Sequence, residues 1–292
     1  MKGSLIVTVG GLFTTIQDRG RFGYRKFGVP VSGAMDKEAY KWANRLLGQS
    51  ENTPVIEMTQ KGGEFLFNTD AVISITGADM SPRINGDLIS TNKVHYITEG
   101  DYLEFDSPEK GYRTYIGILG EWSLKKVMSS FSTYTLGEFG GLHGELLDVG
   151  DKISWEERKP ENVLEEIPKE CIPYYSSKLT VEFIAGPEWD WLTKEEQEKF
   201  LSTPFKVNSR SNRMGIRLDM EEPLSIPNRD MKSSGVIPGI IQLPPNGKPI
   251  ILMQDGQTVG GYPRIGKVLD IYLGRVAQVP PGGIVRFMQS KK

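Results

Sequence analysis

The residues best suited to chemistry lie in a glycine-rich segment near the C-terminus, between residues 233 and 266. Two runs typical of β-strands, 240–243 and 249–253, alternate there with turns rich in glycine and proline. Polar side chains gather at the turn after the second run: Gln254, Asp255, Gln257, Thr258, Tyr262 and Arg264. Glycine lets backbone amides approach a ligand closely, and a rigid strand fixes where loop side chains point. The pattern is typical of a small-molecule site, although a proline-stiffened hairpin with solvated tips would give it equally well.

Two arginine-rich loops are candidates for binding an anion. The first places Asp18 and Arg19 in a glycine-broken loop, and the second carries Arg210, Asn212 and Arg213. A guanidinium suits a carboxylate or phosphate because its planar donors match two acceptor oxygens. The alternative for each arginine is a surface ion pair, worth about 0–1 kcal/mol, or a solvated strand face. Ser32 lies in a turn shortly after the first of these loops and is a further candidate for binding the substrate.

Metal and phosphate motifs are scarce in this sequence. With only His95 and His143, we expect no histidine-rich metal site, and the single Cys171 gives neither a disulfide nor metal-ligand spacing. No Gly-x-Ser-x-Gly elbow and no phosphate-binding loop is present. If ATP or biotin is used, another chain must therefore bring it.

The composition indicates a β-rich protein of the cytoplasm. The 292 residues carry 35 basic and 37 acidic side chains, well mixed, so nucleic acid is not expected as a partner. No run approaches the roughly 18 apolar residues of a membrane span, and no secretion signal precedes the first strand-like run. The 33 glycines and 18 prolines predict many turns.

Short strand-like runs dominate the chain, and helices are few. The predicted strands are residues 4–9, 64–67, 72–76, 102–105, 114–119, 180–184, 250–253, 269–273 and 284–288. Asn85-Gly86 predicts a tight turn between two strands. The clearest helix spans 36–47, with Asp36 and Gly48 at its ends, and another follows Thr193. Weaker helical candidates are residues 124–128 and 162–166.

A recurrent pattern predicts two similar halves, although ordinary β-hairpin patterning would explain it almost as well. A turn–strand pattern recurs at residues 100–105, 150–155 and 282–287, and a charge-rich stretch at 156–170 is typical of a linker. We therefore predict an N-terminal lobe with linker over residues 1–170 and a C-terminal lobe over 171–292. Each lobe is expected to be a β-barrel with few helices.

Several segments together resemble one family. They are Gln17 to Arg21 with Gly23-Tyr24, Gly28 to Asp36, Ala43-Asn44 with Leu47-Gly48, Ile75 to Ala78, Ser209 to Gly215, and Ser234 to Pro263. In this order, and over nearly the whole chain, they are similar to the allophanate-hydrolase-subunit-2-like family, also called the biotin-dependent carboxyltransferase or Kip-antagonist family. The resemblance implies a mainly β fold of two cyclophilin-like β-barrel lobes.

The resemblance also implies a function in a complex. Bacterial members look like the C subunit of the ATP-dependent 5-oxoprolinase, whose subunits together convert 5-oxo-L-proline to L-glutamate. The implied partners are the A and B subunits of that enzyme, the latter similar to allophanate hydrolase subunit 1 or the Kip inhibitor. The chain would be inactive alone and hold no covalent cofactor, and the assembled complex would use ATP. The alternatives are a regulatory protein that antagonises a Kip-type kinase inhibitor, and half of a biotin-dependent urea or amide carboxyltransferase.

Site roles follow from the chemistry that the resemblance implies. Opening an amide requires a polarised carbonyl, a positioned nucleophile and donors for the oxyanion. The predicted catalytic residues are Asp255 as a base or orienting group, Tyr262 as a hydrogen-bond donor and Arg213 as a clamp for a small anionic substrate. The predicted substrate-binding residues are Asp18, Arg19, Ser32, Arg210, Asn212, Gln242, Thr258, Gly260 and Gly261.

Overall fold

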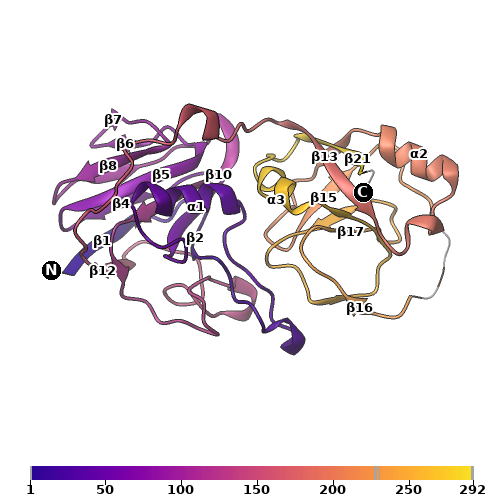
Figure 1. Ribbon diagram of the computed structural model, residues 1–292, viewed down its shortest axis with the longest axis horizontal. Helices are drawn as coiled ribbons and strands as arrows, with labels where there is room; N and C mark the ends of the chain where they lie inside the picture. Colours follow the sequence, from indigo (N-terminus) through magenta and orange to yellow (C-terminus); the bar gives the residue numbers. More distant parts are fainter. Residues whose placement is uncertain (1, 227–228, 230, 291–292) are drawn as a thin grey trace. The chain divides into compact units, whose positions relative to one another are not determined.

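The computed structural model describes residues 2–226, 229 and 231–290. Its contacts divide the chain into two compact units (Figure 1). Unit 1 comprises Met1–Arg21 and Ser32–Tyr175, and unit 2 comprises Phe22–Val31 and Ser176–Lys292. Among the described residues, no helix has the length and apolar character needed to cross a membrane.

Unit 1 is built from two antiparallel sheets that enclose one apolar core. The first sheet has the order β11-β12-β1-β4-β9-β6-β7 and the second β2-β3-β10-β5-β8. The bounds are β1 Lys2–Val9, β2 Phe13–Gln17, β3 Val55–Thr59, β4 Glu64–Phe67, β5 Ala71–Asp79, β6 Arg83–Ile84, β7 Asp87–Leu88, β8 Lys93–Ile97, β9 Tyr102–Glu104, β10 Lys110–Ile118, β11 Glu121–Trp122 and β12 Lys152–Glu156. Side chains from both sheets, such as Leu5 and Phe67 of the first and Ile56 and Ile116 of the second, pack in the same cluster. Burying this apolar surface is the main source of the unit's stability.

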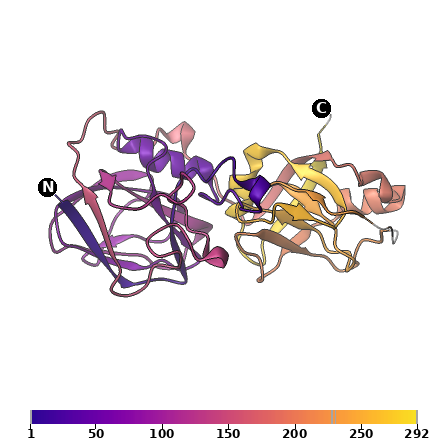
Figure 2. The ribbon, with the colours of Figure 1, turned by 90° about the horizontal axis from the view of Figure 1, so that it is seen from below.

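One long helix covers part of the second sheet of unit 1. Helix α1 (Lys37–Leu46) begins after Asp36, whose carboxylate accepts hydrogen bonds from the amides of Glu38 and Ala39. The Thr76 hydroxyl of β5 donates to the Ala39 carbonyl at 2.8 Å, which fixes the helix on the sheet. Figure 2 shows the helix outside the strands of this unit. The predicted helix at 36–47 is confirmed.

Unit 2 is a closed barrel with the strand order β13-β20-β17-β18-β15-β14-β21. The bounds are β13 Lys178–Ala185, β14 Phe205–Val207, β15 Gly215–Asp219, β16 Ser234–Gly235, β17 Ile240–Gln242, β18 Ile250–Leu252, β19 Val259–Gly260, β20 Arg264–Val268, β21 Ile284–Gln289, α2 Lys194–Ser202 and α3 Asp270–Ala277. Strands β13 and β21 pair in parallel, and the other barrel pairs are antiparallel. Phe183, Phe200 and Phe287 pack edge-to-face or stacked inside. The mainly β fold class is thus confirmed.

Local predictions succeeded where residue types leave little choice. Asn85 and Gly86 form the two-residue turn between β6 and β7, with φ of 52° and 86°, the left-handed values that such a hairpin turn requires. Thr193 caps α2 by accepting a hydrogen bond from the amide of Glu196. Eight of the nine predicted strands overlap strands of the structure, the exception being residues 269–273.

Three local predictions were wrong. Residues 269–273 are not a strand but the N-cap and first turn of α3, because Leu269, Leu273 and Val276 recur at helical rather than alternating spacing. Residues 124–128 form no helix: Val127 bridges to Ser130 across a tight turn. Residues 162–166 are likewise non-helical, and Asn162 has a φ of 55°. Both segments are too short for a helix without tertiary support.

Candidate functional site

The polar residues of unit 2 come together because β15 and β18 are neighbours in the barrel. The two strands pair antiparallel, with Gly215 opposite Leu252, so the residues before β15 meet those after β18. The amide of Asp255 donates to the Arg213 carbonyl at 2.9 Å, and the Met253 amide donates to the Met214 carbonyl at 2.9 Å. Two loops far apart in sequence are thereby joined.

A buried ion pair occupies this junction. Arg213 Nε donates to Asp255 Oδ2 at 2.7 Å and Arg213 Nη2 to Asp255 Oδ1 at 3.3 Å, with both side chains 6% exposed. The guanidinium and carboxylate planes therefore meet in a two-point contact that fixes both orientations. Arg213, predicted as a clamp for substrate, gives these two donors to Asp255, and its catalytic role stays a prediction.

Two glutamines of unit 2, Gln242 and Gln254, are buried. Gln242 ends β17, is 1% exposed and accepts a hydrogen bond from Gln257 Nε2 at 3.0 Å. Gly260 leaves room for it, because a Cβ at that position would lie 2.5 Å from Gln242 Nε2. Within the described part of the chain, Gln242 Nε2 and Gln254 Oε1 are buried and have no hydrogen-bond partner. Unpartnered buried amide atoms are rare in folded proteins and indicate a place where a ligand's polar groups can bind.

The remaining predicted residues of this loop flank β19, which pairs with β16. The backbone amide of Val236 donates a hydrogen bond to the backbone carbonyl of Thr258 at 3.0 Å. Tyr262 is 45% exposed, and its hydroxyl has no hydrogen bond among the described residues. Gly261 is exposed, whereas the Gly256 amide already donates to the Met253 carbonyl at 3.0 Å. The structure therefore joins Arg213 to Asp255 and Gln242 to Gln257 and Gly260, but shows no contact of Tyr262 with either group.

In unit 1, Asp18 is held by the chain itself. Its carboxylate is 5% exposed and accepts hydrogen bonds from the Gly20 amide at 2.8 Å, the Phe131 amide at 2.6 Å and the Ser130 hydroxyl at 2.7 Å, as well as from Ser132 Oγ. These donors tie two loops together. Asp18 was predicted to bind substrate, and that role stays a prediction.

The neighbouring arginines of unit 1 differ in exposure. Arg19, a predicted substrate-binding residue, is exposed, whereas Arg21 is fully buried. The Arg21 guanidinium donates to the Ser132 carbonyl and lies over the Phe139 ring at 4.8 Å from its centroid. The loop around Arg21 is thus ordered by polar contacts inside unit 1.

Ser32 is a buried residue with an unusual backbone conformation. It has a φ of 53° and is fully buried, and its hydroxyl has no hydrogen-bond partner in the described residues. Such a conformation in a non-glycine residue costs free energy and is concentrated at functional sites. Three residues further, the Met35 amide donates to Glu57 Oε2 at 2.8 Å and the Asp36 amide to the Tyr115 hydroxyl at 2.8 Å.

Sequence reasoning missed a polar face of the second sheet in unit 1. The side chains concerned share one face of β2, β3 and β10, and each is at most 8% exposed: Thr15, Gln17, Glu57, Thr59, Arg113 and Tyr115. Burial, followed by the nearby Glu57 and Asp36 carboxylates, raises the pKa of Tyr115 well above its ordinary value. The available signal was Glu57, a carboxylate inside the apolar run 55–58. In an antiparallel strand, a charged residue between apolar ones usually faces solvent, so the sequence pattern alone does not show that Glu57 is buried.

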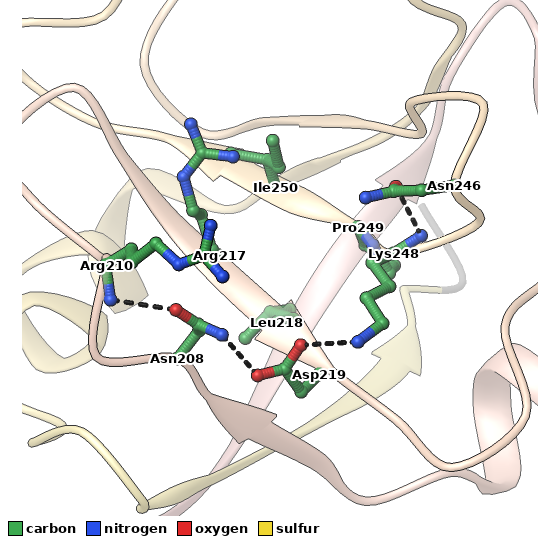
Figure 3. A pocket seen from close by; sticks show the side chains of 9 residues that line it. All are labelled: Asn208, Arg210, Arg217, Leu218, Asp219, Asn246, Lys248, Pro249 and Ile250. Atoms are coloured by element: carbon green, nitrogen blue, oxygen red, sulfur yellow. Dashed lines mark hydrogen bonds and ion pairs between the residues drawn. The ribbon is translucent and has the colours of Figure 1, made fainter.

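Unlike the buried Arg213, the other two predicted residues of the second arginine loop, Arg210 and Asn212, are exposed. Asn212 Oδ1 accepts a hydrogen bond from the Met214 amide at 2.9 Å, and this hydrogen bond shapes the turn before β15. Arg210 lines a separate pocket with Arg217 (Figure 3). Among the described residues, no group of three His, Cys, Asp or Glu side chains is placed to hold a metal ion.

Comparison with known proteins places these features in a family context. The family model described as "Carboxyltransferase domain, subdomain A and B" matches residues 27–289. The chain is 34% identical to the C subunit of 5-oxoprolinase from Escherichia coli (strain K12), over 96% of this chain and 89% of that protein. It is 33% identical to the C subunit of 5-oxoprolinase from Haemophilus influenzae, over 94% of this chain and 87% of that protein.

The fold also matches part of a much larger solved structure. The crystal structure of the K. lactis urea amidolyase superposes with a TM-score of 0.92 and 28% sequence identity over 98% of this chain. The chain spans only 18% of that protein. The match supports the fold and the relationship over the whole length of this chain.

Proposed function

This chain belongs to the family of carboxyltransferase domains with subdomains A and B, and on that premise we propose that it is the C subunit of a 5-oxoprolinase. With partner subunits it would convert 5-oxo-L-proline to L-glutamate. The observation that carries the proposal is the extent of the match. The chain accounts for 89% and 87% of two proteins named as C subunits of 5-oxoprolinase, but for 18% of urea amidolyase.

The naming of those relatives as C subunits implies that other subunits accompany them. We propose that the partners of this chain are an A subunit and a B subunit, the latter similar to allophanate hydrolase subunit 1. The assembled complex would use ATP, because hydrolysing it offsets the cost of opening a five-membered lactam. The sequence has no phosphate-binding loop of its own, so the ATP that is hydrolysed is assigned to a partner.

The buried polar end of the barrel in unit 2 is the proposed contribution of this chain to the site. Arg213 orients the Asp255 carboxylate through two hydrogen bonds, so that Asp255 acts as a base or holds a donor. Gln242 and Gln254 keep buried amide atoms available for the polar groups of a small anionic substrate. The exposed Tyr262 hydroxyl would donate to the substrate carbonyl oxygen as negative charge develops on it.

The test is reconstitution from purified subunits. The chain is mixed with its partner subunits, ATP and 5-oxo-L-proline, and glutamate is measured. Glutamate should form only when all subunits and ATP are present, and this chain alone should be inactive. A complete set of subunits that makes no glutamate would contradict the proposal.

A biotin-dependent carboxyltransferase acting on urea or an amide is the second candidate, favoured by the family description and by the match to urea amidolyase. Adding avidin to the reconstituted complex separates the two, because avidin sequesters biotin. Loss of activity with avidin would favour carboxyl transfer, and unchanged glutamate formation would favour lactam hydrolysis. A regulatory antagonist of a Kip-type inhibitor would bind its partner tightly and show turnover with neither substrate.

A further inference from the structure

The outer face of the barrel in unit 2 carries a pocket of about 290 Å³ (Figure 3). Its walls come from the loop before β15, from β15 itself, and from the turn leading into β18. The lining residues are Asn208, Arg210, Arg217, Leu218, Asp219, Asn246, Lys248, Pro249 and Ile250. The pocket thus involves neither Arg213 nor Asp255 and is separate from the buried ion pair.

Strand alternation explains why charged side chains line this pocket. Ile216 and Leu218 of β15 point into the barrel core and are at most 2% exposed, so Arg217 and Asp219 point outward. Arg217 lies opposite Ile250 in the pairing of β15 with β18. Leu218, Pro249 and Ile250 are the apolar residues of the lining.

The loop that brings Arg210 to the pocket is fixed by local hydrogen bonds. Asn208 Oδ1 accepts the Arg210 amide at 2.8 Å, and the Asn208 amide donates to the Arg217 carbonyl at 2.9 Å. One turn therefore sets the backbone positions of both arginines. Figure 3 shows their side chains on one side of the pocket and Lys248 on the other.

The charges in the pocket are unbalanced. Asp219 accepts hydrogen bonds from Lys248 Nζ at 2.9 Å and from Asn208 Nδ2, and these two hydrogen bonds lower the pKa of Asp219. One carboxylate thus faces three cations, so the lining residues sum to a charge of +2. In the part of the chain that the structure describes, neither the Arg210 nor the Arg217 guanidinium forms a hydrogen bond or ion pair.

We propose that this pocket binds the phosphate group of a small molecule, with Arg210 and Arg217 as its principal ligands. Two guanidiniums present several N–H donors from different directions, which suits the tetrahedral oxygens of a phosphate, and the net charge matches its dianion. Lys248, held by Asp219, supplies a further positive charge. The proposal rests on unit 2 alone and is independent of the proposed 5-oxoprolinase activity.

Isothermal titration of the full chain at constant ionic strength tests the proposal, with inorganic phosphate, pyrophosphate, ADP and glutarate as probes. Phosphate compounds should bind at least about tenfold more tightly than glutarate, because a dicarboxylate cannot place its oxygens on both arginines and Lys248 in the same way. ADP binding more tightly than pyrophosphate would identify a nucleotide as the ligand. Equal binding would identify the phosphate group itself, and both results support the site.

Variants distinguish binding in the pocket from a general attraction of anions to the positive charge of this face. Arg210→Gln and Arg217→Gln should each weaken pyrophosphate binding about tenfold or more, and Arg217→Lys should recover only part of the loss. Lys206→Gln is the matched control, because exposed Lys206 lies opposite Asp219 on β14 but does not line the pocket. The proposal is overturned if pyrophosphate does not bind at millimolar concentration, or if Lys206→Gln weakens binding as much as Arg217→Gln. Circular dichroism checks that each variant is folded.

Discussion

Arg213 and Asp255, 42 residues apart in sequence, form a two-point ion pair that is almost completely buried in the barrel of unit 2. A backbone hydrogen bond from Asp255 to the Arg213 carbonyl reinforces the same junction. This pair links the strand that begins at Gly215 to the loop that leaves β18. The pair is therefore a structural element of the proposed site as well as a candidate for its chemistry.

The first prediction concerns the stability of this pair. Asp255→Ala should lower the free energy of unfolding by about 3–5 kcal/mol, because it leaves the Arg213 guanidinium buried without this carboxylate. Urea denaturation followed by fluorescence measures the effect. Asp270→Ala is the control: it removes the Lys267–Asp270 pair, in which the carboxylate is exposed, and should cost less than about 1 kcal/mol. Equal effects of the two substitutions would show that the buried pair is not an important stabilising contact.

A second prediction separates chemistry from folding at the same residue. Asp255→Asn keeps the shape of the side chain and one acceptor oxygen for Arg213, but removes the negative charge. In the reconstituted complex it should lower the rate of glutamate formation by at least about tenfold, with far-UV circular dichroism unchanged. Wild-type turnover in a folded Asp255→Asn or Arg213→Ala variant would move the site elsewhere.

The third prediction uses the two glycines of the β16–β19 ribbon. Gly260→Ala would place a Cβ 2.5 Å from Gln242 Nε2, so Gln242 must shift and its hydrogen bond with Gln257 is disturbed. Turnover of the complex should fall, while stability changes by less than about 1 kcal/mol because a side-chain amide can yield. Gly235→Ala, which meets no atom within 4 Å, is the matched control and should leave both quantities unchanged. The idea fails if both variants have equal activity.

A fourth prediction follows from the Glu188–Arg264 pair. Hydrogen bonds from Arg264 lower the pKa of Glu188 below its ordinary value of 4.5. A lowered folded-state pKa stabilises the fold above about pH 4.5, and this contribution is lost as pH falls through the lower value. Glu188→Gln should therefore destabilise the protein by about 1–3 kcal/mol at pH 7, with the difference from wild type shrinking below pH 4. A difference that stays constant from pH 7 to pH 3 would exclude this explanation.

The fifth prediction compares two helix caps. The Asp36 carboxylate accepts two amides of α1 and the Tyr175 hydroxyl at 2.7 Å, and the residue is 2% exposed. Thr193 accepts a single amide of α2 at 3.3 Å and is exposed. Asp36→Ala should therefore lower the free energy of unfolding by about 2 kcal/mol or more, and Thr193→Ala by about 0.5–1 kcal/mol. Thermal unfolding of the two variants checks the order, and the reverse order would contradict it.

Local structure was predictable where one residue type decides it. Asn85-Gly86 accepts the positive φ angles of a tight turn, and Asp36 and Thr193 cap their helices through short-range hydrogen bonds. The strand prediction for residues 269–273 was wrong because a short apolar run suits a strand or a helix until its neighbours are known. Only the packing of Leu273 and Val276 decides for the helix.

The β-rich class of this protein, its turns and caps, and the polar residues of its glycine-rich loops could be predicted from the order of residues. Those properties depend on contacts between residues close in the chain. Tertiary structure alone decided that Arg213 meets Asp255, that Glu57 is buried on a polar sheet face, and that Arg210 and Arg217 share a pocket. Strand order and register set these meetings, and both depend on long-range pairing that no local pattern of residues specifies.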